Sequence, residues 1–348
     1  MTTTVPGVPA FDLPPGSEAT APPEHRGVPR DGVRLLVAGP EGVTHQHFRD
    51  LPELLEPGDL VVVNTSATRP AAVDGVRRDG RAVPVHVSTV LDDGHWVVEV
   101  RRSDGRGPDG SVAPGEVLTL PGNVRLRLVD PYVAATEPVR LWRATVDPDL
   151  DPDRYLSGRG RPITYRHLSS RYPLAAYQTV YATAVGSAEM PSAGRPFTAQ
   201  LLVRLMANGV TIAPVVLHAG VSSPEAHEPP IPERYDVPAV TARLVASARS
   251  ANRRIVAVGT TTVRALETAT GPDGSVVAGS GWTDLVLGPD RPARIVSGLV
   301  TGLHEPGASH LLLLTAVAGP SLVSAAYAAA VEHGYRWHEF GDSTLLLP

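Results

Sequence analysis

Residues 71–153 differ in pattern from the chain on either side of them, and this contrast restricts the fold more than any other feature. Short runs of alternating apolar and polar residues are separated here by turns rich in Gly, Asp and Pro, for example at residues 83–87, 96–100 and 124–128. Alternation with a period of two is typical of half-buried strands, and a series of such strands indicates a small all-β unit. We therefore predict a small β-barrel over residues 71–153.

The rest of the chain alternates between strand-like and helix-like segments. The expected strands are at residues 59–63, 210–217, 255–258 and 295–303, and the expected helices at 240–250, 309–317 and 321–333. Alternation of this kind is typical of a parallel sheet covered by helices. We predict an α/β domain with a mainly parallel sheet and flanking helices, built from residues 1–70 and 154–348, with the barrel domain of residues 71–153 inserted into it.

The composition excludes several kinds of chemistry. The 348 residues contain no cysteine, so disulfides, thiolate nucleophiles and cysteine-bound metals are excluded. All 31 basic residues are arginine, and without lysine neither a Schiff-base enzyme nor a phosphate loop of the GxxxxGK type is possible. The net charge of −5 argues against indiscriminate binding of nucleic acid but allows a local basic patch.

The sequence also predicts where the protein is found. Its N-terminal residues show no basic segment followed by an apolar one, so no secretory signal is expected. The apolar stretch at residues 310–331 is divided by Ala-Gly-Pro at 318–320, which predicts two buried helices rather than a membrane span. We expect a cytoplasmic monomer without membrane contact.

The sequence IVAVGTTTVRALE, residues 255–267, predicts a buried strand, a tight loop and a helix that starts near residue 263. Arg264 would then lie in the first helical turn, where the helix dipole disfavours a cation by roughly 0.3–1 kcal/mol. A bound carboxylate or phosphate would offset this cost. The alternative is an ion pair between Arg264 and Glu267 on a helix capped by one threonine. The candidate anion ligands are Thr260, Thr261, Thr262 and Arg264.

Polar residues follow each expected strand of the sheet. In parallel α/β sheets, ligands bind beyond the carboxyl ends of the strands, so these residues should line one pocket. Those at the strand ends are Asn64, His218, Thr261, Arg264 and His304. His218 and His304 are candidates for acid–base chemistry because histidine titrates near neutral pH, although a lone histidine is often structural. A metal site that combines them with His227 and Glu305 matches no zinc spacing, and no metal is predicted.

The segment of residues 154–188 is rich in arginine and tyrosine. It holds five arginines and five of the nine tyrosines, and it has neither Asp nor Glu. Arginine interleaved with aromatic residues suits phosphate contacts and base stacking. The alternative is a solvated connection between domains.

Several stretches together resemble one family, the S-adenosylmethionine:tRNA ribosyltransferase-isomerases of queuosine biosynthesis. They follow the family order over nearly the whole chain. The stretches are HFRDLPELLEPGDLVVVN (47–64), YQTVYA (177–182), PSAG (191–194), IVAVGTTTVRALE (255–267), GWTDL (281–285), LVTGLHEP (299–306) and FGDSTLLL (340–347).

The resemblance implies a reaction in which S-adenosylmethionine donates its ribosyl carbons. These pass to the aminomethyl group of a 7-deazaguanine base in tRNA and rearrange to give epoxyqueuosine, with release of adenine and methionine. It also implies an α/β fold with an inserted barrel, no metal, and tRNA as a partner through residues 154–188. The acid and base would be His218 and His304. Further substrate-binding residues implied by the matching stretches are Tyr177, Gln178, Tyr181, Ser192, Gly194 and Glu267.

The chain also departs from the family pattern. Two arginines are absent from residues 64–72, the sequence PSAGRPF at 191–197 lacks a histidine, and Gly302 replaces an asparagine. Residues 221–223 and 231–233 differ as well. Because the scaffold stretches remain while substrate-facing ones change, two alternatives stay open. One is a related enzyme that transfers from S-adenosylmethionine to a small molecule, and the other is a non-catalytic binder of tRNA or a nucleoside.

Overall fold

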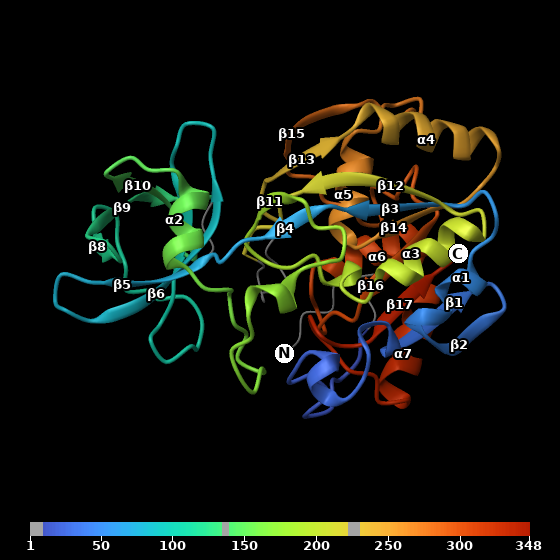
Figure 1. Cartoon of the computed structure of the whole chain (residues 1–348), viewed down its shortest axis with the longest axis horizontal. Coiled ribbons are helices and arrows are strands. Elements are labelled where there is room, and N and C mark those ends of the chain that lie inside the picture. The colour runs from blue at the N-terminus through green and yellow to red at the C-terminus, as the bar shows by residue number, and fades with distance from the viewer. Residues whose placement is uncertain (1–9, 134–138, 222–229) are drawn as a thin grey trace.

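The computed structural model of the chain describes residues 10–133, 139–221 and 230–348. Figure 1 shows a main body built around a large sheet and, to its left, a separate barrel. In the described residues the large sheet has nine strands. Their order is β15 (Gly279–Thr283), β13 (Glu233–Val237), β12 (Thr211–Leu217), β3 (Leu60–Asn64), β14 (Ile255–Val258), β16 (Gly298–Gly302), β17 (Ser343–Leu346), β1 (Arg34–Gly39) and β2 (Gly42–His47).

The sheet is mixed, which corrects the prediction of a mainly parallel one. The central strands β12, β3, β14 and β16 run parallel to one another, and β1 runs parallel to β17. The pairs β15–β13, β13–β12, β16–β17 and β1–β2 are antiparallel. Antiparallel neighbours need no crossover helix, so a two-residue turn suffices between β1 and β2. The four central strands place their carboxyl ends on one edge of the sheet.

Helices cover both faces of the sheet, so the predicted arrangement is confirmed in part. Successive side chains of a strand point to opposite faces. In β3, Leu60 and Val62 pack with α4–α7, whereas Val61 and Val63 pack with α1 and α3. The helices are α1 (Leu51–Leu54), α2 (Pro152–Arg159), α3 (Ala199–Ala207), α4 (Ala239–Ser250), α5 (Thr260–Thr268), α6 (His310–Ala318) and α7 (Pro320–Glu332). Short 3-10 helices occur at Pro23–Arg26, Arg30–Gly32, Phe48–Asp50, Leu174–Tyr177 and Ser192–Gly194.

The apolar stretch at residues 310–331 forms two helices, as predicted. α6 ends at Ala318, the next residue is Gly319 with a φ of +77° that an L-amino acid rarely adopts, and Pro320 begins α7. Within the described residues, every helix is too short or too polar to cross a membrane.

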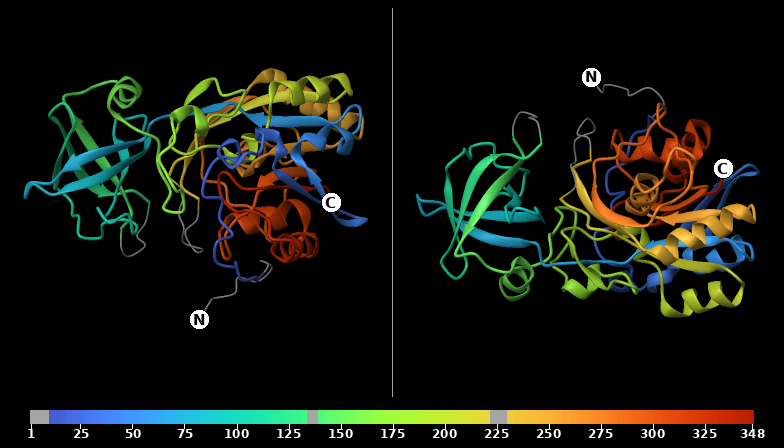
Figure 2. Two further views of the ribbon diagram at one scale, coloured as in Figure 1. Left: turned by 60° about the horizontal axis from the view of Figure 1, so that its bottom comes forward. Right: turned by 90° about the horizontal axis from the view of Figure 1, so that it is seen from above.

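A closed barrel with six strands in the described residues forms from the turn-rich part of the chain. Its strands, in barrel order, are β10 (Leu141–Asp147), β7 (Trp96–Val100), β6 (Ala82–Val90), β5 (Ala72–Val76), β8 (Val117–Leu120) and β9 (Val124–Pro131). The alternation of apolar and polar residues explains why these segments form barrel strands. In β9, Leu126 and Leu128 are buried, and the alternating Arg125 and Arg127 are exposed. Figure 2 shows the barrel beside the main body in both further views. The domain boundaries at residues 71 and 153 stay a prediction.

A two-stranded parallel ribbon lies between the barrel and the large sheet. It consists of β4 (Ser66–Thr68), which follows β3 directly, and β11 (Ala184–Ser187). In Figure 1 this ribbon lies where the chain leaves the sheet for the barrel. The carboxyl edge of the central strands therefore faces the barrel.

Candidate active site

A cavity of about 640 Å³ lies between the carboxyl edge of the central strands and the barrel. A volume of this size suits a ligand of several hundred daltons. The sheet contributes the start of α5 and the loop after β16, the barrel contributes His86 and Arg101, and the arginine-rich segment contributes residues 161–167 and Arg171. The cavity therefore lies at the edge where the polar strand-end residues were expected to meet.

The loop between β14 and α5 is tighter than the sequence suggested. α5 begins at Thr260 rather than near residue 263, and its N-cap is Gly259 rather than a threonine. Gly259 has φ of +90°, a conformation that favours glycine. Because the helix starts earlier, Arg264 lies in its second turn and not in its first.

The three threonines of this loop have different surroundings. Thr260 and Thr261 line the cavity. The side chain of Thr262 is fully buried, and its hydroxyl donates to the Val258 carbonyl at 2.7 Å. The first two hydroxyls and the helix start can therefore reach a ligand, whereas the third closes the loop.

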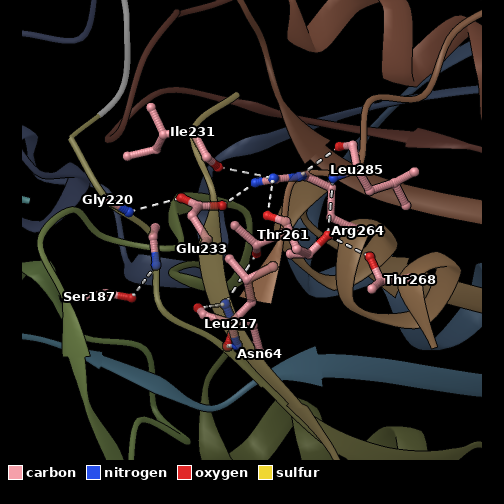
Figure 3. Close-up of polar contacts among 12 residues, drawn as sticks. Asn64, Ser187, Leu217, Gly220, Ile231, Glu233, Thr261, Arg264, Thr268 and Leu285 are labelled. Atoms are coloured by element: carbon pink, nitrogen blue, oxygen red, sulfur yellow. Dashed lines mark hydrogen bonds and ion pairs between the residues drawn. The ribbon is translucent and has the colours of Figure 1, made fainter. Parts of the chain in front are cut away.

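Asn64 makes hydrogen bonds to three segments of the chain, one of which carries Thr261 (Figure 3). Its Nδ2 donates to the Leu217 carbonyl at 2.8 Å and to Thr261 Oγ1 at 3.1 Å. Its Oδ1 accepts from the backbone N–H groups of Ser66 and Leu217, both at 3.0 Å. With its side chain buried and its hydrogen bonds made to protein groups, Asn64 holds Thr261 in place.

Arg264 is buried and contacts protein oxygens (Figure 3). Its Nη1 pairs with Glu233, and Glu233 Oε1 also accepts from the Gly220 N–H at 2.8 Å. Its Nε donates to the Leu285 carbonyl at 3.1 Å, and its Nη2 donates to the carbonyls of Thr283 at 3.0 Å and Ile231 at 3.2 Å. Burial raises the pKa of Glu233, and the charge of Arg264 opposes that rise. These contacts favour a structural role for Arg264, and its role as an anion ligand stays a prediction.

Glu267 does not form the i, i+3 pair that the sequence allowed. Its buried carboxylate accepts from the backbone N–H groups of residues 294–296, at 2.8–3.1 Å. These amides donate to Glu267 rather than to a neighbouring strand, and β16 starts at Gly298 rather than at residue 295. Glu267 sets the position of the strand that leads to His304.

His218 follows β12 and packs against the ribbon. Its Nδ1 lies 2.7 Å from Ser66 Oγ, which in turn lies 2.6 Å from Ser187 Oγ. A β-carbon at Gly186 would collide with the imidazole, so this close approach requires glycine. Burial, with the charge of Arg69, lowers the pKa of His218. His218 lies outside the set of described residues that line the cavity.

His304 lines the cavity and belongs to a pair of stacked imidazoles. Its ring lies parallel to that of His310 at 4.6 Å, and its Nε2 is 3.0 Å from Thr301 Oγ1. Burial and the neighbouring imidazoles lower the pKa of His304 well below its usual value. Burial, then the charge of Arg264, lowers the pKa of His310 to about 4. Both rings are therefore neutral at physiological pH.

A second group of rings on the cavity wall was not singled out from the sequence. His338 and His167 stack at 4.6 Å, and Tyr165 stacks on His167 at 5.8 Å. Glu305 lies 3.0 Å from His338, and Glu339 lies 3.2 Å from His167. These residues come from separate parts of the chain, so the sequence does not show that they meet. Its only indications were Glu305 at a strand end and the position of His338 and Glu339 directly before FGDSTLLL.

Of the residues implied by the stretches YQTVYA and PSAG, only some lie at the cavity. Ser192 lines the cavity, whereas a β-carbon at Gly194 would collide with the Tyr181 hydroxyl. Gln178 pairs with β4, since its Oε1 accepts from the Thr68 N–H at 3.0 Å and its Nε2 donates to the Thr68 carbonyl at 2.7 Å. Burial, then Glu339, raises the pKa of the Tyr177 hydroxyl to about 12, and burial raises that of Tyr181 further.

The structure thus brings part of the predicted site to one cavity. The predicted residues among its described lining are Ser192, Thr260, Thr261 and His304. The other predicted residues lie outside this lining, and their substrate-binding roles and the acid–base role of His218 stay predictions. His227 lies outside the described residues. Among the described ones, we find no group of three or more His, Asp or Glu side chains that could hold a metal ion.

Comparisons with known proteins place the chain in a family. The family described as queuosine biosynthesis protein matches residues 9–346. The S-adenosylmethionine:tRNA ribosyltransferase-isomerase of Heliobacterium modesticaldum is 36% identical over 353 residues, which cover 97% of this chain and 98% of that protein. The protein of the same name from Anaeromyxobacter dehalogenans is 38% identical over 354 residues, which cover 97% of each chain.

A solved structure shows the same similarity. The crystal structure of S-adenosylmethionine tRNA ribosyltransferase from Thermotoga maritima is 32% identical in sequence and superposes with a TM-score of 0.54. The superposition covers 97% of this chain and 99% of that chain. Since the family match and these relatives span nearly the whole sequence, the chain belongs to the queuosine biosynthesis protein family.

Proposed function

We propose that the protein is an S-adenosylmethionine:tRNA ribosyltransferase-isomerase. The main support is that relatives with this name align over 97% of the chain. In addition, the most specific of the family-like stretches, VGTTTVRALE, begins at the cavity. In the proposed reaction the ribosyl carbons of S-adenosylmethionine pass to 7-aminomethyl-7-deazaguanine in tRNA and rearrange to epoxyqueuosine. Adenine and methionine leave.

The cavity offers distinct places for the two substrates. Thr260 and Thr261 lie at the start of α5, where backbone N–H groups and the helix dipole favour an anion, so we assign the methionine carboxylate to this end. His304 is a neutral imidazole on the same wall and can accept the acidic proton beside the sulfonium. S-adenosylmethionine therefore serves as a co-substrate, and no metal enters the proposed reaction.

The barrel side of the cavity suits the tRNA. Cationic side chains line this part of the wall, and arginine contacts with phosphates dominate the affinity of proteins for nucleic acid. They are Arg101, Arg102, Arg161, Arg166 and Arg171. Three of the five belong to the arginine- and tyrosine-rich segment, which supports the prediction that this segment contacts tRNA. We propose that the barrel of residues 71–153 is an inserted domain that helps to hold the tRNA.

The test follows the ribosyl carbons. Purified protein is incubated with S-adenosylmethionine labelled with ¹³C in its ribose and with tRNA that carries the aminomethyl base, and the nucleosides are analysed by mass spectrometry. Label in an epoxyqueuosine nucleoside is expected. Label in a small product would instead show a small-molecule acceptor, and unconverted S-adenosylmethionine would show a binding protein. Sedimentation of the 36.6 kDa chain tests the proposed monomer, and fractionation of cells tests the cytoplasmic location.

A further inference from the structure

Two pairs of histidines meet in the cavity, and their surroundings differ. His304 and His310 stack with each other, and the oxygen that lies beside His304 Nε2 belongs to the neutral hydroxyl of Thr301. His338 stacks on His167, and each of these two imidazoles has a carboxylate within 3.2 Å. Since Glu305 follows His304 directly, one loop carries both the neutral His304 and the carboxylate that faces His338.

The position of His338 is closely defined. Its Nε2 lies 3.0 Å from Glu305 Oε1, and only 18% of its side chain is exposed. Its backbone is left-handed, with φ of +70°, which is uncommon for residues other than glycine. Backbone conformations of this kind persist where the surrounding structure enforces them, and they are concentrated at functional sites. The FGD turn that follows and the ring of His167 therefore hold the imidazole on the cavity wall.

The charges around His338 favour its protonated form. The ionisable groups that face it are Glu18, Glu305, Glu339, His167 and His304. Burial disfavours the cation, but the hydrogen bond with Glu305 and the charges of the three glutamates outweigh burial and raise the pKa of His338. His304, on the same wall, has its pKa lowered. Ionisable groups whose surroundings separate their pKa values in this way mark the acid and the base of a site.

We propose that His338 is the proton donor of this site, positioned by Glu305, and that it protonates the leaving adenine. This inference rests on the proposed function. In the step, the bond between the ribosyl carbon and the adenine nitrogen breaks, and its electron pair passes to adenine. The proton on Nδ1 of His338, the ring nitrogen that does not face Glu305, adds to a ring nitrogen of adenine, while the ring oxygen of the ribose supplies electrons to the carbon. His338 is left neutral and regains its proton from water.

The test measures adenine release from S-adenosylmethionine in the presence of modified tRNA, between pH 6 and pH 9. Asparagine accepts a left-handed backbone, so His338→Asn keeps the turn. General acids contribute about 10²- to 10⁴-fold, and we expect kcat of His338→Asn to fall by this factor. KM for S-adenosylmethionine should change by less than about 3-fold, because a proton donor acts mainly in the transition state. The alkaline limb of the pH profile, where wild-type activity falls as His338 loses its proton, should disappear.

A second variant tests the positioning role. Glu305→Gln removes the negative charge but keeps an oxygen near His338, so the alkaline limb should move to lower pH. The NMR titration of the His338 imidazole, assigned by its loss in His338→Asn, should shift in the same direction. His333→Asn, at the exposed end of α7, is the matched control and should match wild type. Thermal melts check that all three variants are folded.

The outcomes separate this inference from the proposed function. If the wild-type protein releases no adenine, the proposed function fails and the inference fails with it. If the wild type is active and His338→Asn keeps its kcat and its alkaline limb, the inference alone is overturned. An alkaline limb unmoved in Glu305→Gln would remove Glu305 as the positioning residue.

Discussion

Arg264 joins strands and loops that are distant in the sequence. Its guanidinium reaches Glu233, 31 residues earlier, and carbonyls 19 and 21 residues later. A buried ion pair contributes little net stability when it replaces hydrophobic packing, but removal of one partner leaves a charge buried without compensation. At the scale of the single residue, Arg264 is therefore expected to contribute to stability, whether or not it also binds an anion.

We expect Arg264→Ala to lower the free energy of unfolding by about 3–5 kcal/mol, because Glu233 would keep a buried charge without its cation. Urea unfolding at neutral pH measures this change. Arg81→Ala is the matched control, since Arg81 is 65% exposed and pairs with Asp79 at the surface, where solvent screens the pair and its loss should leave the unfolding midpoint nearly unchanged. Equal unfolding midpoints for Arg264→Ala and wild type would contradict the structural role.

Helix α6 shows how one element couples pH to stability. Its first residue is His310, where both burial and the positive end of the helix disfavour a charged imidazole. The pKa of His310 falls from 6.5 to about 4 in the folded protein. Between these values the unfolded chain binds a proton that the folded chain does not, so stability is complete above pH 6.5 and is lost as the pH falls toward 4.

His310→Asn should flatten this pH dependence. Between about pH 4.5 and pH 6.5, the slope of unfolding free energy against pH should decrease by up to about 1.4 kcal/mol per pH unit. Urea unfolding at several pH values gives the slope directly. Gln46→Asn, at an exposed and uncharged position on β2, should leave the slope as in wild type. An unchanged slope in His310→Asn would show that another group carries the acid sensitivity.

At the scale of the whole molecule, the cavity forms because the barrel strands follow β3 and β4 in the chain and precede the other strands of the sheet that line it. β4 and β11 lead from the carboxyl edge of the sheet to the barrel, so the arginines of both parts face the same opening. A macromolecular substrate can therefore contact the barrel while one of its bases reaches the strand ends.

We expect Arg166→Ala combined with Arg171→Ala to weaken tRNA binding and to reduce its salt dependence. Each phosphate contact contributes about 0.7–0.9 to the slope of log Kd against log salt, so loss of two contacts should lower the slope by about 1.4–1.8. Fluorescence anisotropy with labelled tRNA over a range of salt concentrations measures it. Arg243→Ala, exposed on α4 away from the barrel, is the control. A slope equal to that of wild type would place the tRNA elsewhere.

Much of the fold could be predicted because it depends on neighbouring residues. Four β-branched or small apolar residues give β14 at the predicted positions, and the alternation in residues 124–128 gives a barrel strand. The family resemblance identified from sequence stretches was confirmed by the comparisons. In each case the signal is a local period or a contiguous motif, which the sequence displays directly.

Contacts between distant segments were decided only by the tertiary structure. Glu267 accepts hydrogen bonds from the amides of residues 294–296, Arg264 pairs with Glu233, and His338 pairs with Glu305. Even the start of α5 depends on the left-handed turn at Gly259. The sequence determined which strands, helices and motif residues exist, because local sterics and periodicity set them. Which charges meet, and hence which histidine has its pKa lowered and which has it raised, depends on burial and on partners that only packing brings together.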